Sequence, residues 1–280
     1  RDRSVPSSVG SKRVMTNVGS QRTQGVSGTV KYSPVYHPEE RINWTLSASF
    51  KHQKAKYEDI GNSLDQFNKE NLNTSLVRYY DGGSPTALWA VRSLGINPSD
   101  GRELFLTKEG TYTFEYDTED EVVVGNSEPK LEGVLGSTLY WKGFSFSLYF
   151  RYSLGADVFT EATYNKVENI SLAGLKSNQD KRALHDRWQK PGDHAKFKGI
   201  SLTETTPISS RFVLRENYIK AESISVGYDF ESQAVQKLGI QSLRLQANTT
   251  DLFRISSIKE ERGIEYPFAR SFSFSLSAMF

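Results

Sequence analysis

The chain has 280 residues, 35 basic and 33 acidic side chains, a formal net charge of +2 and a mean hydropathy of −0.53. The balanced charge, with no long basic run, argues against nucleic acid as a partner, and the absence of cysteine excludes disulfides, thiolate metal sites and a cysteine nucleophile. No apolar run approaches the roughly 20 residues of a membrane-spanning helix, so only strands could cross a bilayer.

The first predicted strands lie at residues 25–36 and 41–51 and are joined by the short segment HPEE. In the second of them, every other residue is apolar: Ile42, Trp44, Leu46, Ala48 and Phe50. This alternation predicts a strand with one apolar and one polar face. The first strand is the weaker prediction, because Pro34 interrupts it and cannot donate a backbone hydrogen bond.

A very long connection is expected from about residue 58 to residue 128. Tyr79 and Tyr80 lie in it, and we consider them candidate substrate contacts, because aromatic rings stack on flat apolar surfaces such as sugar faces. Packing of loop against loop is the alternative for both. The acidic run DTEDE, residues 117–121, is interpreted as a solvated face.

The next two predicted strands, residues 131–141 and 144–154, are separated only by Lys142 and Gly143. The apolar residues of the second strand alternate with polar ones, and they are Phe144, Phe146, Leu148, Phe150, Tyr152 and Leu154. Tyr149 and Arg151 fall on the polar face. We expect them to line a water-filled lumen or to contact a plug.

A second long connection, about residues 160–211, contains Trp188 as a further candidate substrate contact. Two His-Asp or Asp-His dipeptides, at 185–186 and 193–194, would bind a metal only if the loop folded back on itself, and we predict no metal site. The chain has no HExxH pair, phosphate-binding glycine loop or nucleophile elbow. We therefore predict no catalytic or cofactor site and no enzyme activity.

Three strands are predicted in the remainder, at residues 218–230, 243–250 and 272–280. In the first, the apolar positions switch from odd to even numbers, which predicts a β-bulge near Glu222 or Ser223. In the second, Arg244 falls on the polar face and is expected to line the lumen. The last strand alternates serines with apolar residues up to the terminal Phe280.

Short and long connections alternate between these strands along the whole chain. Because antiparallel neighbours place successive connections at opposite ends of a sheet, all large loops lie at one end, as in outer-membrane barrels. No Lys or Arg stands on the apolar face of the four clearest strands, where one would cost roughly 2–4 kcal/mol in lipid. The pattern predicts an all-β fold, an antiparallel transmembrane β-barrel, partial, with long extracellular loops.

Five segments, in order, match the motifs of a known family. They are LGINPSDGRELF (94–105), VVGNSEPKLEGVLGSTLYWKGFSFSLYF (123–150), DRWQKPGD (186–193), YIKAESISVGY (218–228) and EYPFARSFSFSLSAMF (265–280). Together they resemble the SusC/RagA-type TonB-dependent outer-membrane transporters of Bacteroidetes, specifically the carboxy-terminal barrel portion. The chain departs from the family pattern at residue 251, where aspartate replaces the usual asparagine, and at Ala269, where proline is commoner.

The resemblance implies a barrel of about 22 strands that imports nutrients, most often oligosaccharides, with peptides as another cargo. It implies as partners a SusD-like surface lipoprotein, outer-membrane lipid, and TonB through a segment missing from this chain. Residues 1–280 would hold about the last seven strands, without the plug and the amino-terminal strands. Such an open sheet leaves two unpaired edges, so we expect that the fragment is not a working channel by itself.

The terminal strand resembles the aromatic signal that outer-membrane proteins present to the barrel-assembly machinery. The residues concerned are Phe272, Phe274, Leu276 and Phe280. An ordinary amphipathic last strand is the alternative. For the whole chain, the alternative to an importer is a soluble or surface-exposed β-rich carbohydrate-binding module whose long loops form the combining site.

Overall fold

The structure is a computed structural model that describes residues 2–4, 13–15, 18–201, 203–230, 239–259 and 269–280. The chain divides into two compact units. We call Gly25–Gln53, Pro129–Ala156 and Arg215–Phe280 the sheet unit. We call Arg1–Gln24, Lys54–Glu128 and Asp157–Leu214 the loop unit.

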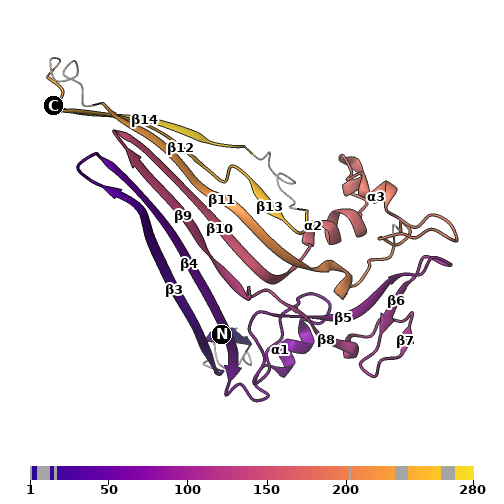
Figure 1. The fold of residues 1–280 in the computed structure, drawn as a ribbon. Coiled ribbons are helices and arrows are strands. Elements are labelled where there is room, and N and C mark those ends of the chain that lie inside the picture. The colour runs from indigo at the N-terminus through magenta and orange to yellow at the C-terminus, as the bar shows by residue number, and fades with distance from the viewer. Residues whose placement is uncertain (1, 5–12, 16–17, 202, 231–238, 260–268) are drawn as a thin grey trace. The chain divides into compact units, whose positions relative to one another are not determined.

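The long strands form one sheet in the order β14-β12-β11-β10-β9-β4-β3, with β13 paired to β11 (Figure 1). Their bounds are β3 Ser20–His37, β4 Ile42–Glu58, β9 Leu131–Trp141, β10 Phe144–Phe159, β11 Val213–Phe230, β12 Ser242–Thr250, β13 Arg254–Ser256 and β14 Phe272–Met279. The ladders of β9 with β4 and β10, and of β12 with β11 and β14, are antiparallel. The seven strands along this path are the seven that the alternation predicted, and within the described residues the sheet is open.

β3 runs without a break through Pro34, so the strand is longer than the sequence suggested. Its one neighbour among the described strands is β4, which makes it an edge strand.

The predicted tight turn between β9 and β10 consists of Lys142 and Gly143. Their φ angles are 46° and 97°, and two successive positive φ angles are characteristic of the hairpin turn that matches strand twist. The connections that follow β4 and β10, by contrast, are long and belong to the loop unit. The alternation of short and long connections is therefore confirmed for the described strands.

The residue pairing of β11 shifts by one residue where the sequence predicted a bulge. Lys220 pairs with Arg254, whereas Ser223 pairs with Thr250. Two residues of β11 therefore lie opposite three residues of the other segment. The additional residue on this side belongs to that opposite segment, where Asp251 has a φ of 53°.

The faces of β11 nevertheless switch as the sequence predicted. Glu222 forms an ion pair with Arg151, and a Cβ atom on Gly227 would stand 2.6 Å from the hydroxyl oxygen of Ser145. Arg151 and Ser145 share a face of β10, because its ladder with β9 has no register shift between them. An even-numbered and an odd-numbered residue of β11 thus face the same way, which a regular strand does not allow.

The loop unit contains a second sheet where the sequence suggested only connections. Its order is β7-β6-β5-β8, with β5 Ala87–Ile96, β6 Glu103–Leu106, β7 Tyr112–Thr113 and β8 Glu121–Asn126. A two-stranded sheet pairs β1 Asp2–Ser4 with β2 Arg13–Met15. The short helices are α1 Asp65–Glu70, α2 Glu161–Thr163, α3 Arg182–His185, the π-helical turn η3 Tyr164–Glu168, and the 3-10 turns η2 Thr118–Asp120, η4 Gly174–Lys176 and η5 Ser210–Phe212.

The loop unit has its own hydrophobic core. Val167, Ala183, Phe197 and Phe212 are buried together, and Phe159, Tyr164 and Ile170 pack against them. Ala90 and Val91 of β5 are each 1% exposed, so both faces of this strand are covered. Among the residues that the structure describes, no helix has the length and apolar character needed to span a membrane.

Candidate functional site

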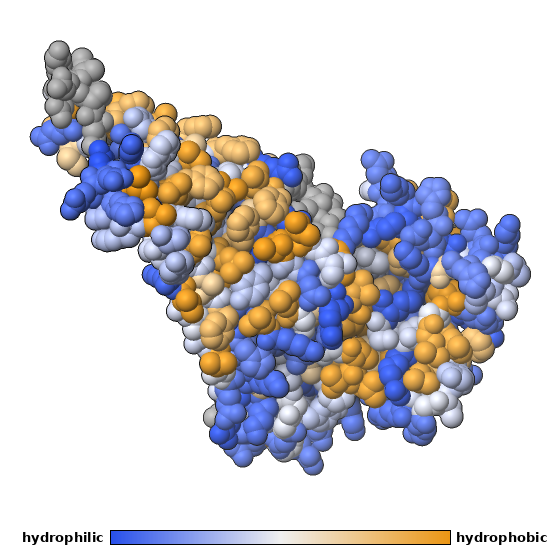
Figure 2. Space-filling model, in the orientation of Figure 1, coloured by the Kyte–Doolittle hydropathy of each residue, from blue (hydrophilic) through white to orange (hydrophobic). Residues whose placement is uncertain are grey.

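The apolar residues of the sheet unit face one side in register. Trp44 pairs with Leu139, Phe150 with Leu135, Tyr228 with Leu245, and Leu245 with Leu276. We call this side the apolar face. Many of its side chains are exposed, including Phe144 at 50% and Phe274 at 77%, and Figure 2 shows apolar side chains at the surface along these strands. This exposure matters, because soluble monomers rarely present large contiguous apolar patches to water.

The opposite side of the sheet unit, the polar face, carries Tyr149, Arg151 and Arg244, as predicted from their parity. Arg151 donates to Glu222 (Nη2 to Oε1, 3.0 Å), and Arg244 donates to Asp229 (Nη2 to Oδ2, 2.9 Å). Charged side chains on this face are thus held in cross-strand pairs.

Every residue of the last strand is exposed, so its two faces are distinguished by the alternating sequence and not by burial. Its apolar residues are 60–79% exposed, and they are Phe272, Phe274, Leu276 and Phe280. On the other side of β14, Ser277 pairs with Arg244 and Ser275 with Gln246. The strand thus has one apolar and one polar face, while its role in assembly stays a prediction.

Two of the motif segments contact each other in the loop unit. The backbone oxygen of Pro98 accepts a hydrogen bond from Nε1 of Trp188 and another from the backbone N–H of Gly192, each of 2.9 Å. The ring of Trp188 covers Gly101, whose φ is 73°. We call this contact of residues 97–101 with residues 186–193 the loop clasp.

The DRWQKPGD segment is also stabilised by hydrogen bonds within the segment and by hydrogen bonds from Arg187 to other parts of the loop unit. Arg187 is buried and donates to the backbone oxygens of Val167, Glu168 and Lys198. The carboxylate of Asp193 accepts from the backbone N–H groups of residues 189 and 190, which closes the turn. The motif therefore encodes a fixed loop conformation.

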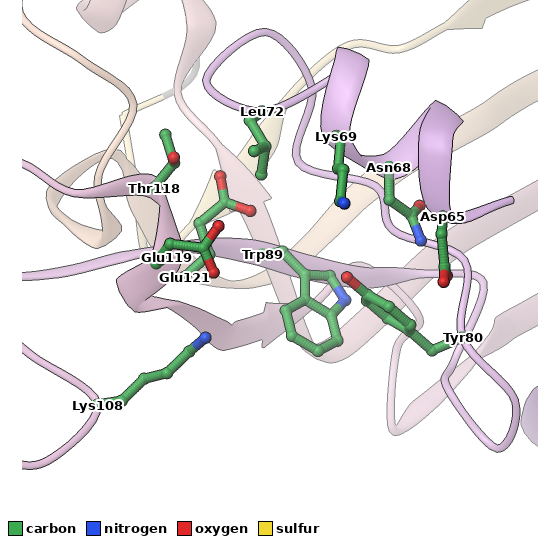
Figure 3. A pocket seen from close by; sticks show the side chains of 10 residues that line it. All are labelled: Asp65, Asn68, Lys69, Leu72, Tyr80, Trp89, Lys108, Thr118, Glu119 and Glu121. Atoms are coloured by element: carbon green, nitrogen blue, oxygen red, sulfur yellow. The ribbon is translucent and has the colours of Figure 1, made fainter. Parts of the chain in front are cut away.

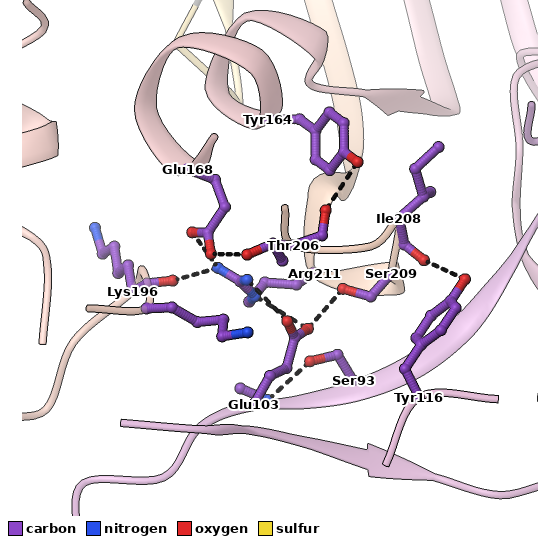
Figure 4. A network of polar contacts seen from close by, with 12 residues as sticks. Ser93, Glu103, Tyr116, Tyr164, Glu168, Lys196, Thr206, Ile208, Ser209 and Arg211 are labelled. Carbon is purple, nitrogen blue, oxygen red and sulfur yellow. Dashed lines mark hydrogen bonds and ion pairs between the residues drawn. The ribbon is translucent and has the colours of Figure 1, made fainter. Parts of the chain in front are cut away.

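The loop unit also contains a buried ionic network (Figure 4). Arg211 joins two carboxylates, with 3.0 Å from Nη2 to Oε2 of Glu103 and 3.0 Å from Nη1 to Oε2 of Glu168. The two carboxylates are 1% and 0% exposed, and each accepts a further hydrogen bond, from Ser209 and Thr206 respectively. Burial would lower the pKa of Arg211, but its hydrogen bonds to Glu168 and Glu103 outweigh burial and raise it.

A second buried ion pair joins Arg78 to Glu121 through two hydrogen bonds of 2.9 and 2.8 Å. Burial raises the pKa of the Glu121 carboxyl above its ordinary value, although Arg78 acts in the opposite direction. The arginine thus compensates only part of the desolvation of this carboxylate.

The three aromatic candidates for substrate contact have different surroundings. Tyr79 packs against Tyr57 and Phe67, and its backbone bonds in both directions to the amide of Asn68, which favours the packing alternative. Tyr80 is exposed. Trp188 lines a cavity of about 440 Å³ together with Phe114 and Tyr116, with its indole nitrogen occupied by the loop clasp. A role in binding stays a prediction for Tyr80 and Trp188.

Sequence reasoning missed Trp89, whose ring centroid lies 5.3 Å from that of Tyr80. Both side chains line a second cavity, of about 260 Å³. Trp89 stands in β5, which is buried on both faces and gave no alternation to follow. The position of an aromatic residue inside a long connection was the signal in the sequence that could have identified Trp89. Within the described ranges, no three His, Cys, Asp or Glu side chains come together as a metal site, and the loop histidines His185 and His194 are no exception.

Comparison with known proteins gives a consistent result. No protein-family model matches the chain. It is 21% identical to TonB-dependent receptor P39 of Formosa agariphila over 303 residues, covering 90% of this chain and 28% of P39. It is 24% identical to TonB-dependent receptor P26 of the same organism, covering 92% of this chain and 27% of P26. The chain therefore spans less than a third of the length of these relatives.

The solved structures decide the fold. A chain of the RagAB peptide importer in its open-open state superposes with a TM-score of 0.74 at 17% identity, over 100% of this chain and 31% of that chain. The closed-closed state gives a TM-score of 0.69 at 18% identity, over 90% of this chain and 28% of that chain. The chain is thus similar in sequence to TonB-dependent receptors and shares the fold of part of the RagAB importer.

This fold match accounts for the open sheet. The strands of the sheet unit match part of the RagAB barrel, and within the described residues they do not close on themselves. TonB-dependent receptors reside in the outer membrane and are transporters rather than enzymes. The partial antiparallel barrel fold agrees with the prediction from sequence.

Proposed function

We propose that this chain forms part of the wall and part of the loops of a TonB-dependent active importer of nutrients. The observation that carries the proposal is the apolar face, which continues from β4 to β14 and leaves large apolar side chains such as Trp44, Phe144 and Phe274 exposed. Contact of such a face with the hydrocarbon of a bilayer is favourable, whereas contact with water is unfavourable. The polar face, with Tyr149, Arg151 and Arg244, would line the lumen or contact the plug.

For the substrate we propose oligosaccharides. The loop unit supports this with Tyr80, an aromatic side chain that is open to solvent, because flat apolar rings stack on sugar faces. Peptides are the second candidate, since the RagAB importers that share the fold are peptide importers. A competition experiment distinguishes the two substrate classes. An unlabelled glycan should compete for uptake if the substrate is an oligosaccharide, and an unlabelled peptide should compete if it is a peptide.

We further propose that residues 1–280 belong to the carboxy-terminal part of the barrel of a longer protein. TonB would act on another segment of that protein, and a SusD-like surface lipoprotein would close it from outside. Support comes from the partial coverage of the relatives and from the fold match to RagAB structures. Phe280 and the apolar residues before it would be read by the barrel-assembly machinery.

Uptake in cells tests the proposal. A strain that lacks the full-length receptor should fail to accumulate a labelled oligosaccharide in the periplasm, and the receptor gene should restore accumulation only when TonB is present. Accumulation that is equal with and without the receptor, for glycans and peptides alike, would contradict it. Recovery of the full-length protein in the soluble fraction without detergent would support a soluble binding module instead.

A further inference from the structure

The cavity of about 260 Å³ in the loop unit has the properties of a small binding pocket. Its walls come from α1, from β5 and from the segment that begins at η2, and Figure 3 shows Trp89 and Tyr80 side by side within it. We call it the aromatic pocket. Its volume lies just below the range of about 300–1,000 Å³ for drug-sized ligands, so it suits a single ring rather than an extended chain.

The two aromatic rings form a platform with free polar tips. Tyr80 is 42% exposed and its ring is tilted by 55° to that of Trp89. Neither the phenol oxygen of Tyr80 nor Nε1 of Trp89 has a hydrogen-bond partner in the part of the chain that the structure describes. This contrasts with Trp188, whose indole N–H is bound to Pro98. An aromatic pair with unused donors is suited to a ligand with an apolar face and polar edges.

The polar groups around the platform offer both donors and acceptors. We call Asp65, Lys69, Lys108 and Glu119 the polar rim. No ion pair joins any of these four side chains to another described residue. Behind the rim, the Glu121 carboxylate accepts two hydrogen bonds from Arg78 and is therefore not counted in the rim.

The charge of the pocket favours an uncharged ligand. Two ammonium groups of the polar rim balance two carboxylates, so the rim carries no net charge that would attract an anion or a cation. Ammonium groups donate hydrogen bonds and carboxylates accept them, whereas a hydroxyl does both. A ligand that has hydroxyl groups around its edge and C–H groups on its face therefore complements both the polar rim and the two aromatic rings.

We propose that the aromatic pocket binds one pyranose ring of a neutral glycan, with the ring face against Trp89 and its hydroxyl groups toward the polar rim. The inference deepens the proposed function, because the sugar would belong to the imported oligosaccharide. It differs from that function in being a property of the loop unit alone. Binding at this pocket can therefore be measured apart from uptake.

The test uses full-length receptor purified in detergent. It is titrated with methyl glycosides of neutral hexoses, and the binding affinity is measured by calorimetry. Trp89→Ala and Tyr80→Ala should each weaken binding about fivefold or more, since loss of a stacking partner removes about 1 kcal/mol or more. Trp89→Phe should retain most of the affinity and guards against loss of folding. Tyr112→Ala is the matched control, because Tyr112 is an exposed aromatic residue of the same unit that does not line the pocket, and it should leave affinity unchanged.

The outcomes separate the two proposals. Glycoside binding that is unaffected by Trp89→Ala and Tyr80→Ala, no binding of any neutral glycoside, or binding of a dipeptide such as glycylglycine at Trp89 would overturn the pyranose assignment while uptake of oligosaccharide could still proceed. Glycoside binding that depends on Trp89, in a receptor that supports no uptake, would uphold the pocket and contradict the importer.

Discussion

A Cβ atom on Gly101 would stand only 2.5 Å from the ring of Trp188. These two residues are 87 positions apart in the chain and belong to two different motif segments. Their contact, with the two hydrogen bonds to Pro98, makes the loop clasp a joint between the two long connections of the chain. The motifs thus specify a particular loop conformation, which a rigid external surface needs.

Gly101→Ala tests this contact. The substitution should strain the left-handed backbone by about 1–2 kcal/mol and add about 1–3 kcal/mol of overpacking against Trp188. Gly110→Ala is the control, because Gly110 has a φ of 86° but open space around its Cβ position. Hydrogen exchange of the Gly192 amide in the full-length receptor measures the effect. Equal exchange in the two variants would show that the Trp188 contact contributes nothing.

Arg211→Ala should open the buried ionic network. It removes the cation between Glu103 and Glu168 and leaves two buried carboxylates without it, a change that costs about 3–5 kcal/mol for a buried pair. Lys56→Ala removes a pair with Glu58 that is half exposed, and about 0–1 kcal/mol is expected. Hydrogen exchange of residues 203–212 reports the difference. Unchanged protection in Arg211→Ala would contradict a stabilising role for the network.

The Arg78 and Glu121 pair should give a pH dependence of known sign. Because burial raises the pKa of Glu121 above 4.5 in the folded state, folding favours its protonated form. Its contribution to stability is complete below pH 4.5 and is lost as the pH rises through the raised pKa. The stability of the wild type relative to Glu121→Gln should therefore fall as the pH rises above 4.5. The measurement is hydrogen exchange of β8 amides, corrected for intrinsic rates, and a relative stability that rises over this range would refute the assignment.

The alternation of apolar and polar residues was sufficient to predict the long strands, because each has one apolar face and one polar face. It failed for β5, where residues such as Ala90 and Val91 are buried on both sides and the pattern carries no period of two. The second sheet was missed for that reason, and Trp89 with it. The bulge in β11 was located from parity alone, but parity cannot assign the additional residue to one of two paired segments.

The candidate site was less predictable than the wall. The loop clasp joins residues about 90 positions apart, so no local spacing encodes it. Arg211, Glu103 and Glu168 are likewise isolated charges in the sequence and form a network only after folding. Tyr79 and Tyr80 are adjacent and identical in type, yet one is packed by Tyr57 and the other lines the aromatic pocket. Which of two neighbours is available to a ligand is a tertiary property.

Leu148→Arg and Ser147→Arg place the same charge at the same height on opposite faces of β10. On the apolar face the arginine should cost up to roughly 2–4 kcal/mol if this position lies near the bilayer midplane, and it should reduce the amount of assembled receptor. On the polar face it meets water and should be tolerated. The amount of full-length receptor in purified outer membranes is the measurement, and equal recovery of the two variants would contradict the assigned faces.

Quenching by brominated lipid tests the lipid-facing apolar face most directly. Full-length receptor variants are reconstituted in bilayers, each with one of the tryptophans Trp44, Trp89, Trp141 or Trp188 replaced by phenylalanine. Trp44 and Trp141 stand on the apolar face, are 36% and 49% exposed, and are expected to lie within reach of the acyl chains. Replacing either of them should reduce the fraction of fluorescence that brominated lipid quenches, while replacing Trp89 or Trp188 should increase it. The reverse order would place the apolar face away from hydrocarbon and contradict the account.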